Sequence, residues 1–295
     1  MSETPGATLR SLIESNAPTV VPGVFDGLSA RMAVAAGFPA LYMSGFSVAG
    51  ATWGQPDIGL LTADEMVSAA ARIVDVAGRV PVIADADNGY GGPLNVARTV
   101  RQYQQAGVAC IQLEDQVSPK RCGHMEGKRV VTCEEAVEKI TAAVEARSSD
   151  DFLIMARTDA RATHDLDEAL VRGERFLQAG ADILFIEAPQ SVEELRTISQ
   201  RFAGVPLTIN LVEDGKTPWP DASALAEMGY RIVLRPVTAL LHLASNLEQT
   251  YLSMAAGDEP GSQRVTFGDF NERVGLHDAN SLADRLRGKP TGDPH

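Results

Sequence analysis

The chain has 295 residues, enough for one large barrel or two ordinary domains, and 44% of them are hydrophobic, which allows a substantial core. Its formal net charge of -13 argues against nucleic acid or an anionic membrane as the main partner, although a local cationic pocket would still accept a small anionic substrate. The sequence has no apolar run near the roughly 18 residues of a membrane span, no signal-peptide pattern and only three cysteines, so we predict a reduced, cytoplasmic protein.

One pattern repeats along the chain: a short β-branched apolar run, a polar turn and a longer amphipathic segment. The apolar runs predict eight strands, at residues 19–25, 40–43, 80–87, 109–115, 152–158, 182–188, 205–210 and 230–236. The amphipathic segments predict eight helices, at residues 27–36, 62–77, 93–106, 134–147, 166–179, 191–201, 221–228 and 237–256. Several of these helices end in a glycine, the residue that best suits the left-handed position after a helix.

Eight strands alternating with eight helices imply a parallel sheet, and eight is the number that closes a TIM barrel. An open doubly wound sheet is the alternative. The barrel is favoured because polar residues fall at the C-terminal ends of many different strands, as they do in barrel enzymes. We predict a (β/α)₈ barrel over residues 1–256 and a C-terminal helical extension over residues 257–295. Its amphipathic stretch 267–288 needs a partner for its apolar face, and a neighbouring subunit is a reasonable one.

Carboxylates gather at the ends of the third and fourth predicted strands. Residues i and i+2 of a strand face the same side, so Asp85 and Asp87 in IADADNGYGG are both predicted to point into the barrel mouth. Glu114 ends the next strand, in LEDQ, and reaches the same rim. Three carboxylates with no cation near them in sequence repel one another, and Mg²⁺ relieves this because it takes oxygen ligands. The alternative, that these acids cap the following helices, suits Asp87 alone better than the whole set.

A cationic loop, SPKRCGHMEGKR at residues 118–129, follows the fourth predicted strand in this acidic chain. Cys122 stands beside Arg121 there, and a thiol next to cations exchanges its proton near neutrality more readily than an isolated one. Cys110 and Cys133 are better interpreted as buried small hydrophobes. The two glycines of the loop allow it to fold over the barrel mouth as a lid.

Polar residues also mark the ends of other strands: Arg157 in ARTD, Glu187 in IEA and Asn210 in TIN. An arginine in this position is either a structural ion-pair partner or a planar fork that binds two carboxylate oxygens at once. After the second strand, Ser44 and Gly45 could offer backbone N–H groups to another carboxylate.

Two other classes of protein share some of these sequence features. A serine hydrolase is suggested by GFSVA at residues 45–49, which approximates a nucleophile elbow, but the second glycine is missing and none of the five histidines has an evident acid partner. A scaffold protein without activity is expected to have lost part of the polar ring, whereas this chain keeps carboxylates, thiol and arginine together.

In this order, YMSG, GQPDIG, ADADNGYGG, LEDQ, KRCGH, ARTD and NLVEDGKTP make the chain resemble the isocitrate lyase and phosphoenolpyruvate mutase superfamily. The KRCGH element resembles that of its cysteine-bearing lyase branch. PGVFDGLSAR and VGLHD are similar to 2,3-dimethylmalate and other 2-alkylmalate lyases, with 2-methylisocitrate lyases close behind. The phrase HMEGKR is also similar to carboxyphosphonoenolpyruvate mutase.

The resemblance implies a Mg²⁺-dependent carbon–carbon lyase, with Mn²⁺ as a possible substitute. It would split a 2-hydroxy dicarboxylate or tricarboxylate into an α-keto acid such as pyruvate and a second carboxylate. The alternative is a phosphonomutase, or an oxaloacetate decarboxylase or hydrolase, on the same scaffold. The resemblance also implies a homotetramer that exchanges its last helix between subunits.

The same resemblance assigns individual residues. It implies that Asp85 ligates the metal directly, that Asp87 and Glu114 hold it through waters, and that Asp57 lies beside them. The catalytic residues it implies are Cys122, which returns a proton to carbon, Arg157, Glu187, Tyr42 and His124. The substrate-binding residues it implies are Ser44, Gly45, Phe46, Lys120, Arg121, Gly123 and Asn210. The base that takes the hydroxyl proton stays open between Tyr42 and Glu187.

One residue departs from the superfamily pattern. Relatives usually carry a small residue after the Ser-Gly of YMSG, whereas Phe46 stands there in this chain. Its ring is expected to shrink or reshape the substrate pocket.

Overall fold

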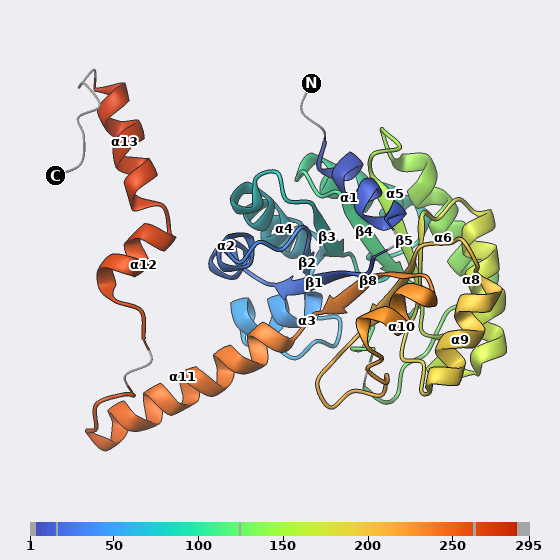
Figure 1. Cartoon of the computed structure of the whole chain (residues 1–295). Coiled ribbons are helices and arrows are strands. Elements are labelled where there is room, and N and C mark those ends of the chain that lie inside the picture. Colours follow the sequence, from blue (N-terminus) through green and yellow to red (C-terminus); the bar gives the residue numbers. More distant parts are fainter. Residues whose placement is uncertain (1–3, 16, 124, 262–263, 288–295) are drawn as a thin grey trace. The chain divides into compact units, whose positions relative to one another are not determined.

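Eight parallel strands close into one barrel in sequence order, β1 to β8, in a computed structural model that describes residues 4–15, 17–123, 125–261 and 264–287 (Figure 1). The strands are β1 (Thr19–Val24), β2 (Leu41–Met43), β3 (Val82–Asp85), β4 (Cys110–Glu114), β5 (Leu153–Thr158), β6 (Ile183–Ile186), β7 (Leu207–Asn210) and β8 (Tyr230–Arg235). Strand β1 pairs with β8 over four residues, which closes the ring and rules out the open doubly wound sheet. The predicted (β/α)₈ barrel is confirmed.

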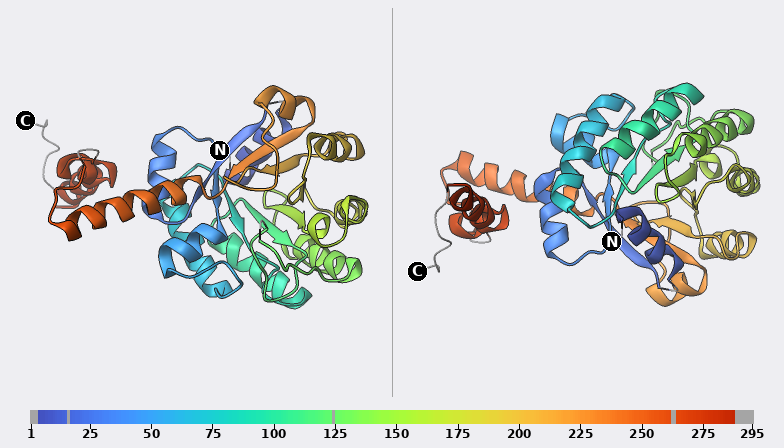
Figure 2. Two further views of the ribbon diagram at one scale, coloured as in Figure 1. Left: turned by 90° about the horizontal axis from the view of Figure 1, so that it is seen from below. Right: turned by 90° about the horizontal axis from the view of Figure 1, so that it is seen from above.

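Helices surround this ring of strands, as both views in Figure 2 show. Up to residue 256 the helices are α1 (Pro5–Glu14), α2 (Gly27–Ala35), α3 (Gly45–Val48), the π-helix η1 (Ala49–Trp53), α4 (Ala63–Ala77), α5 (Pro93–Gln105), α6 (Cys133–Ala146), α7 (Ala160–Thr163), α8 (Leu166–Gln178), α9 (Val192–Arg201), α10 (Ala222–Glu227) and α11 (Thr238–Ala256). Many begin at a side chain that caps free backbone N–H groups; Thr62 and Glu65, for example, form a capping box at the start of α4.

The barrel interior is a packed core rather than a pore. Inward-facing strand residues such as Ile83, Met155 and Phe185 form one buried cluster. Leu9 and Ile13 of α1 belong to the same cluster, so α1 closes the N-terminal end of the barrel. Helix α1 was not predicted from the sequence, although its threonine cap and the proline in its first turn are helix-start signals. With that end closed, a site has to lie at the opposite mouth, where the carboxyl ends of the strands meet.

By chain contacts the protein divides into two compact units, Met1–Leu241 and His242–His295. The second unit contains most of α11 and two further helices, α12 (Phe267–Arg273) and α13 (Leu276–Leu286). The single amphipathic stretch expected over 267–288 is thus divided, at Gly275, whose φ of 85° is left-handed.

The second unit lacks a core of its own, since none of its described residues is buried. Phe267 and Leu286 expose 84% and 79% of their surfaces. Within the part of the chain that the structure describes, no helix is long and apolar enough to span a bilayer. So much exposed apolar surface on a short segment is typical of an interaction face.

Candidate active site

The predicted carboxylates meet at the carboxyl ends of β3 and β4. Asp85 is the last residue of β3 and Glu114 the last residue of β4, and both are buried. Asp87 lies beyond the strand, with a left-handed φ of 47°. It therefore reaches the cluster through a turn and not by the strand alternation that sequence analysis assumed. Aspartate accepts this conformation at lower cost than most residues.

Asp85 is held by three donors. Its Oδ1 accepts from the backbone N–H of Asp87 at 3.1 Å and from Nε2 of Gln112 at 3.3 Å, while its Oδ2 accepts from the N–H of Gly45 at 3.3 Å. Gln112 also accepts a hydrogen bond from the hydroxyl of Tyr42, at 3.0 Å. Gln112 was not among the predicted site residues, although it stands two residues before Glu114 on β4 and so faces the same interior.

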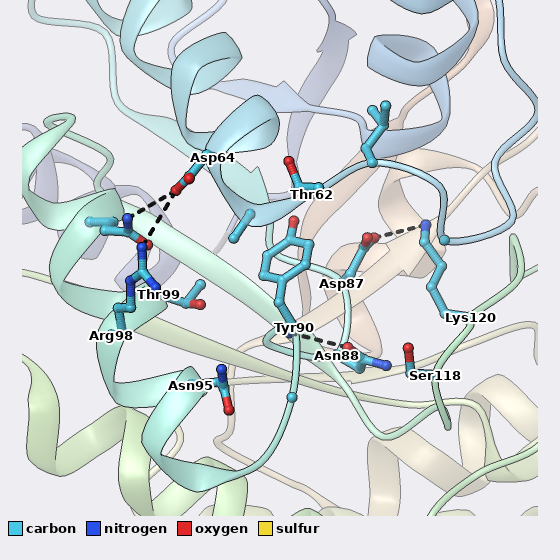
Figure 3. A pocket seen from close by; sticks show the side chains of 15 residues that line it. Thr62, Asp64, Asp87, Asn88, Tyr90, Asn95, Arg98, Thr99, Ser118 and Lys120 are labelled. Atoms are coloured by element: carbon cyan, nitrogen blue, oxygen red, sulfur yellow. Dashed lines mark hydrogen bonds and ion pairs between the residues drawn. The ribbon is translucent and has the colours of Figure 1, made fainter.

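A buried lysine lies among the carboxylates. Nζ of Lys120 is 2.5 Å from Oδ1 of Asp57 and 2.8 Å from Oδ1 of Asp87, and Figure 3 shows the second of these contacts. Lys120 comes from the loop after β4, so no spacing in the sequence revealed a cation here. Burial raises the pKa of Asp87 to about 6, and the nearby ammonium only partly offsets that rise. Lys120, expected among the substrate-binding residues, therefore also neutralises the acidic cluster.

Arg157, near the end of β5, holds a second set of acids. Its Nη1 is 3.2 Å from Oε2 of Glu187, and its Nε is 3.5 Å from Oε2 of Glu114. It also donates twice to Asp159, through Nε at 3.0 Å and Nη2 at 3.1 Å. Asp159, the last residue of the ARTD motif, was not among the predicted site residues, yet its carboxylate fixes the plane of the guanidinium. The guanidinium lies over the ring of Phe185, 5.2 Å from its centroid.

The cluster fits a hard divalent cation. Its donors are oxygens, and Oε1 of Glu114 is buried with no hydrogen-bond partner among the described residues. Burial raises the pKa of Glu114 well above its usual value, so a nearby cation would stabilise its charged form. A Cβ at Gly45 would lie 2.7 Å from Oδ2 of Asp85, so glycine keeps this space open. No three metal-ligating side chains of the described residues enclose an ion by themselves.

The predicted lid forms one wall of the site. One antiparallel bridge, between Gln116 and Val130, joins the two ends of this loop. At its tip, the N–H of Cys122 donates to the carbonyl of Asp57 at 3.3 Å. A Cβ on Gly123 would lie 2.4 Å from Nη2 of Arg157, so only glycine allows the loop to come this close.

Most of the predicted site residues line one cavity of about 260 Å³ at this mouth. They are Tyr42, Ser44, Phe46, Asp57, Asp85, Glu114, Lys120, Arg121, Cys122, Gly123, Arg157 and Asn210. Asp87, Gly45 and Glu187 stand behind them, in contact with Lys120, Asp85 and Arg157 respectively. His124 lies outside the described residues.

Two details differ from expectation. The N–H of Ser44 is used within the protein, in a hydrogen bond to the carbonyl of Val24 at 3.2 Å. The N–H of Gly45 is likewise directed to Asp85, at 3.3 Å. The sequence suggested these two N–H groups as donors to a substrate carboxylate, whereas in the structure both donate to groups of the protein itself. Phe46 does line the cavity, on an apolar side that it shares with Val212 and Leu241.

A second hollow, of about 410 Å³, lies on the other side of Asp87 and Lys120 (Figure 3). Its other walls include Thr62, Asp64 and Arg98. Cys122, Arg157 and Glu114 do not line this second hollow. We therefore assign the active site to the smaller cavity, where acids, cations and thiol face one space.

Known proteins are similar to this chain over most of its length. The family model described as phosphoenolpyruvate phosphomutase matches residues 9–255. A 2,3-dimethylmalate lyase from Eubacterium barkeri is 46% identical over 273 residues, which cover 92% of this chain and 94% of that protein. A 2-methylisocitrate lyase from Aeropyrum pernix is 43% identical over 282 residues, 94% of this chain and 89% of that one.

Solved structures are similar over nearly the whole length. A crystal structure of 2,3-dimethylmalate lyase, described as a member of the PEP mutase/isocitrate lyase superfamily, has a TM-score of 0.91 and 40% identity, with 100% of each chain covered. Oxaloacetate acetylhydrolase bound to 3,3-difluorooxalacetate gives 0.93 and 35%, covering 98% and 99%. Phosphonopyruvate hydrolase in complex with oxalate and Mg²⁺ gives 0.84 and 27%, covering 96% and 99%.

Proposed function

Because the chain belongs to the phosphoenolpyruvate mutase/isocitrate lyase superfamily, we propose that it is a metal-dependent carbon–carbon lyase. Its substrate would be a 2-hydroxy dicarboxylate or tricarboxylate of the 2-alkylmalate or 2-methylisocitrate type. One observation carries this proposal: Cys122 lines the same cavity as the acidic cluster and Arg157. A cleavage that leaves a carbanion needs these three parts: a metal site, an anion-stabilising fork and a proton donor.

The acidic cluster is the proposed metal site. Asp85 would ligate Mg²⁺ or Mn²⁺ directly, with Asp87 and Glu114 acting through waters and Asp57 beside them. Held by these residues, the ion would supply a Lewis acid that makes the 2-hydroxyl easier to ionise. Lys120 keeps Asp57 and Asp87 in place by ion pairs of 2.5 and 2.8 Å.

Arg157 would bind the carboxylate on which negative charge develops. Three of its N–H groups point to Asp159 and Glu187, through Nε, Nη2 and Nη1. Because each Nη carries two hydrogens, one on each remains for the two oxygens of a carboxylate. When the C2–C3 bond breaks, its electron pair becomes an enolate of that carboxylate, and a fork already held in place stabilises it.

Proton transfer completes the reaction. The hydroxyl oxygen gives up its proton and becomes the keto oxygen of the first product, while the thiol of Cys122 donates a proton to the enolate carbon. Burial, with Asp85 nearby, raises the pKa of Tyr42 well above 10, so this hydroxyl keeps its proton and serves as a donor. Of the two bases considered, Glu187 is the one that we favour.

A panel of substrates tests the proposal. We expect turnover of at least one 2-alkylmalate or of 2-methylisocitrate, with Mg²⁺ required and short alkyl groups preferred because Phe46 narrows the cavity. Appearance of the α-keto acid is measured with and without a chelator. The panel includes oxaloacetate and phosphonates. Turnover of these compounds alone would identify a hydrolase or phosphonomutase instead, and no turnover of any compound would support a silent scaffold.

We also propose a reduced, cytoplasmic homotetramer. The exposed apolar side chains of α12 and α13 are best covered by another copy of the chain.

Truncation tests the assembly. A chain that ends at residue 260 loses Phe267 and Leu286 together with the rest of α12 and α13, so it is expected to leave the tetramer or to become poorly soluble. Light scattering coupled to size exclusion gives the mass of the full and shortened chains. A shortened chain that still forms a soluble tetramer would show that this segment has no part in assembly.

A further inference from the structure

Lys128 of the lid has no role in the proposed chemistry, yet its side chain is buried in an ion pair. Nζ of Lys128 lies 2.7 Å from Oδ1 of Asp159 and also donates to the carbonyl of Gly123. The side chains of this ion pair are 3% and 0% exposed. Burying two charges is costly, and removing one partner of such a pair leaves the other charge uncompensated.

Asp159, the partner of Lys128, is also the partner of Arg157, the residue proposed to bind the substrate carboxylate. Oδ1 of Asp159 accepts from Nη2 of Arg157 at 3.1 Å, and its Oδ2 accepts from Nε at 3.0 Å. Burial alone would raise the pKa of Asp159, but Arg157 and Lys128 together hold it well below its usual range. A cation of the lid and a cation of the barrel therefore share one buried carboxylate.

The position of the lid is thereby linked to the geometry of Arg157. If the loop lifts, Asp159 loses Lys128 and is left with Arg157 as its only cation among those contacts, while Gly123 moves away from Nη2. We propose that Lys128 is a positioning residue: its ion pair with Asp159 fastens the lid over the cavity and sets the plane of the Arg157 fork. The inference rests on the proposed function for its kinetic part and not for its structural part.

The chain offers a matched control. Lys216 forms another ion pair with the lid, 2.5 Å from Oε1 of Glu126, but these side chains are 38% and 88% exposed. Exposed pairs contribute little because water and salt screen them. Lys128→Met and Lys216→Met thus remove the same charge from two contacts that differ in burial.

Alkylation of Cys122 by iodoacetamide reports lid opening in the full chain without any substrate. The rate is followed by mass spectrometry of the peptide that contains Cys122 and compared at its high-pH plateau, where every thiol is ionised. Lys128→Met is expected to raise this rate at least about tenfold and to lower kcat by a similar factor. Lys216→Met should stay within about twofold of the native protein in both.

Two further variants decide the mechanism. Lys128→Arg keeps the cation, so its alkylation rate should stay close to that of the native protein. This variant keeps the proposal testable if Lys128→Met folds poorly. In an Asp159→Asn background, Lys128→Met should add little, because both changes remove the same contact. An alkylation rate in Lys128→Met no higher than in Lys216→Met, or effects of Lys128→Met and Asp159→Asn that simply multiply, would overturn the proposal. If the alkylation results hold but no alkylmalate is turned over, the proposed function fails and the lid contact stands.

Discussion

Replacing Asp85 by alanine is expected to abolish metal-dependent turnover while the barrel stays folded. Asp85 is the proposed direct ligand, and its carboxylate also organises Gln112, Gly45 and the turn at Asp87. Loss of groups that merely orient a metal ligand typically costs about 10–100-fold, so loss of the ligand itself should exceed about 100-fold. Turnover is measured over a range of Mg²⁺ concentrations, and Mn²⁺ binding is measured independently by electron paramagnetic resonance.

Asp64 supplies the control for that variant. It is an exposed carboxylate at the start of α4, outside the active-site cavity, and Asp64→Ala should leave both turnover and Mn²⁺ binding close to native. Circular dichroism checks that each variant is folded. Full activity of the native protein in excess chelator, or unchanged Mn²⁺ binding in Asp85→Ala, would exclude the metal site described here.

Replacing Cys122 by serine should lower turnover by about 10²–10⁴-fold, the usual contribution of a general acid. A serine hydroxyl is a far weaker acid than a thiol and returns the proton to the enolate slowly. Substrate affinity should change much less, because the proposed contacts to the carboxylates come from Arg157 and the metal site and not from sulfur. Turnover and binding of the best substrate are compared in the two proteins.

The proposed role of Cys122 as proton donor also predicts the isotope content of the product. When the native reaction runs in D₂O, the product carboxylate should carry deuterium at the carbon that was cleaved. Cys133→Ser is the matched control, since this thiol lies at the start of α6, away from the cavity. Near-native turnover in Cys122→Ser, or product without solvent deuterium, would rule out the thiol as the proton donor. A phosphonomutase, which returns no proton to carbon, would not show this dependence.

The barrel could be predicted from the sequence because its signals are local. Each strand is a short apolar run and each main helix an amphipathic segment, so all eight of each were found. Two of the helices that were missed, α3 and α7, are only four residues long and sit in loops, where no periodicity can develop. Helix α1 was missed although its ten residues begin with a threonine cap and a proline in the first turn. The α12–α13 stretch was read as one helix because its apolar pattern continues across the break at Gly275.

The site residues at strand ends could be predicted from the sequence. The contacts that join loops to distant segments could not. Glu114 and Arg157 follow from the register of parallel strands. The pairing of Lys120 with Asp87 joins a loop to a turn, and that of Lys128 with Asp159 joins a loop to the end of another strand. Residues so far apart in sequence meet only because the chain closes, and a single sequence carries no local pattern for such a meeting.

The residues that line the active-site cavity come from two parts of the fold, the strands of the barrel and the segments that follow them. The groups proposed for metal binding and charge stabilisation come mainly from β3, β4 and β5, which pack on both faces. The apolar residues that line the cavity, such as Phe46, Val212 and Leu241, come from the segments after β2, β7 and β8. Selectivity can therefore diverge by substitutions at the rim without disturbing the packed interior. A scaffold of this kind is evolvable: one reaction chemistry can be inherited while the preferred acid changes.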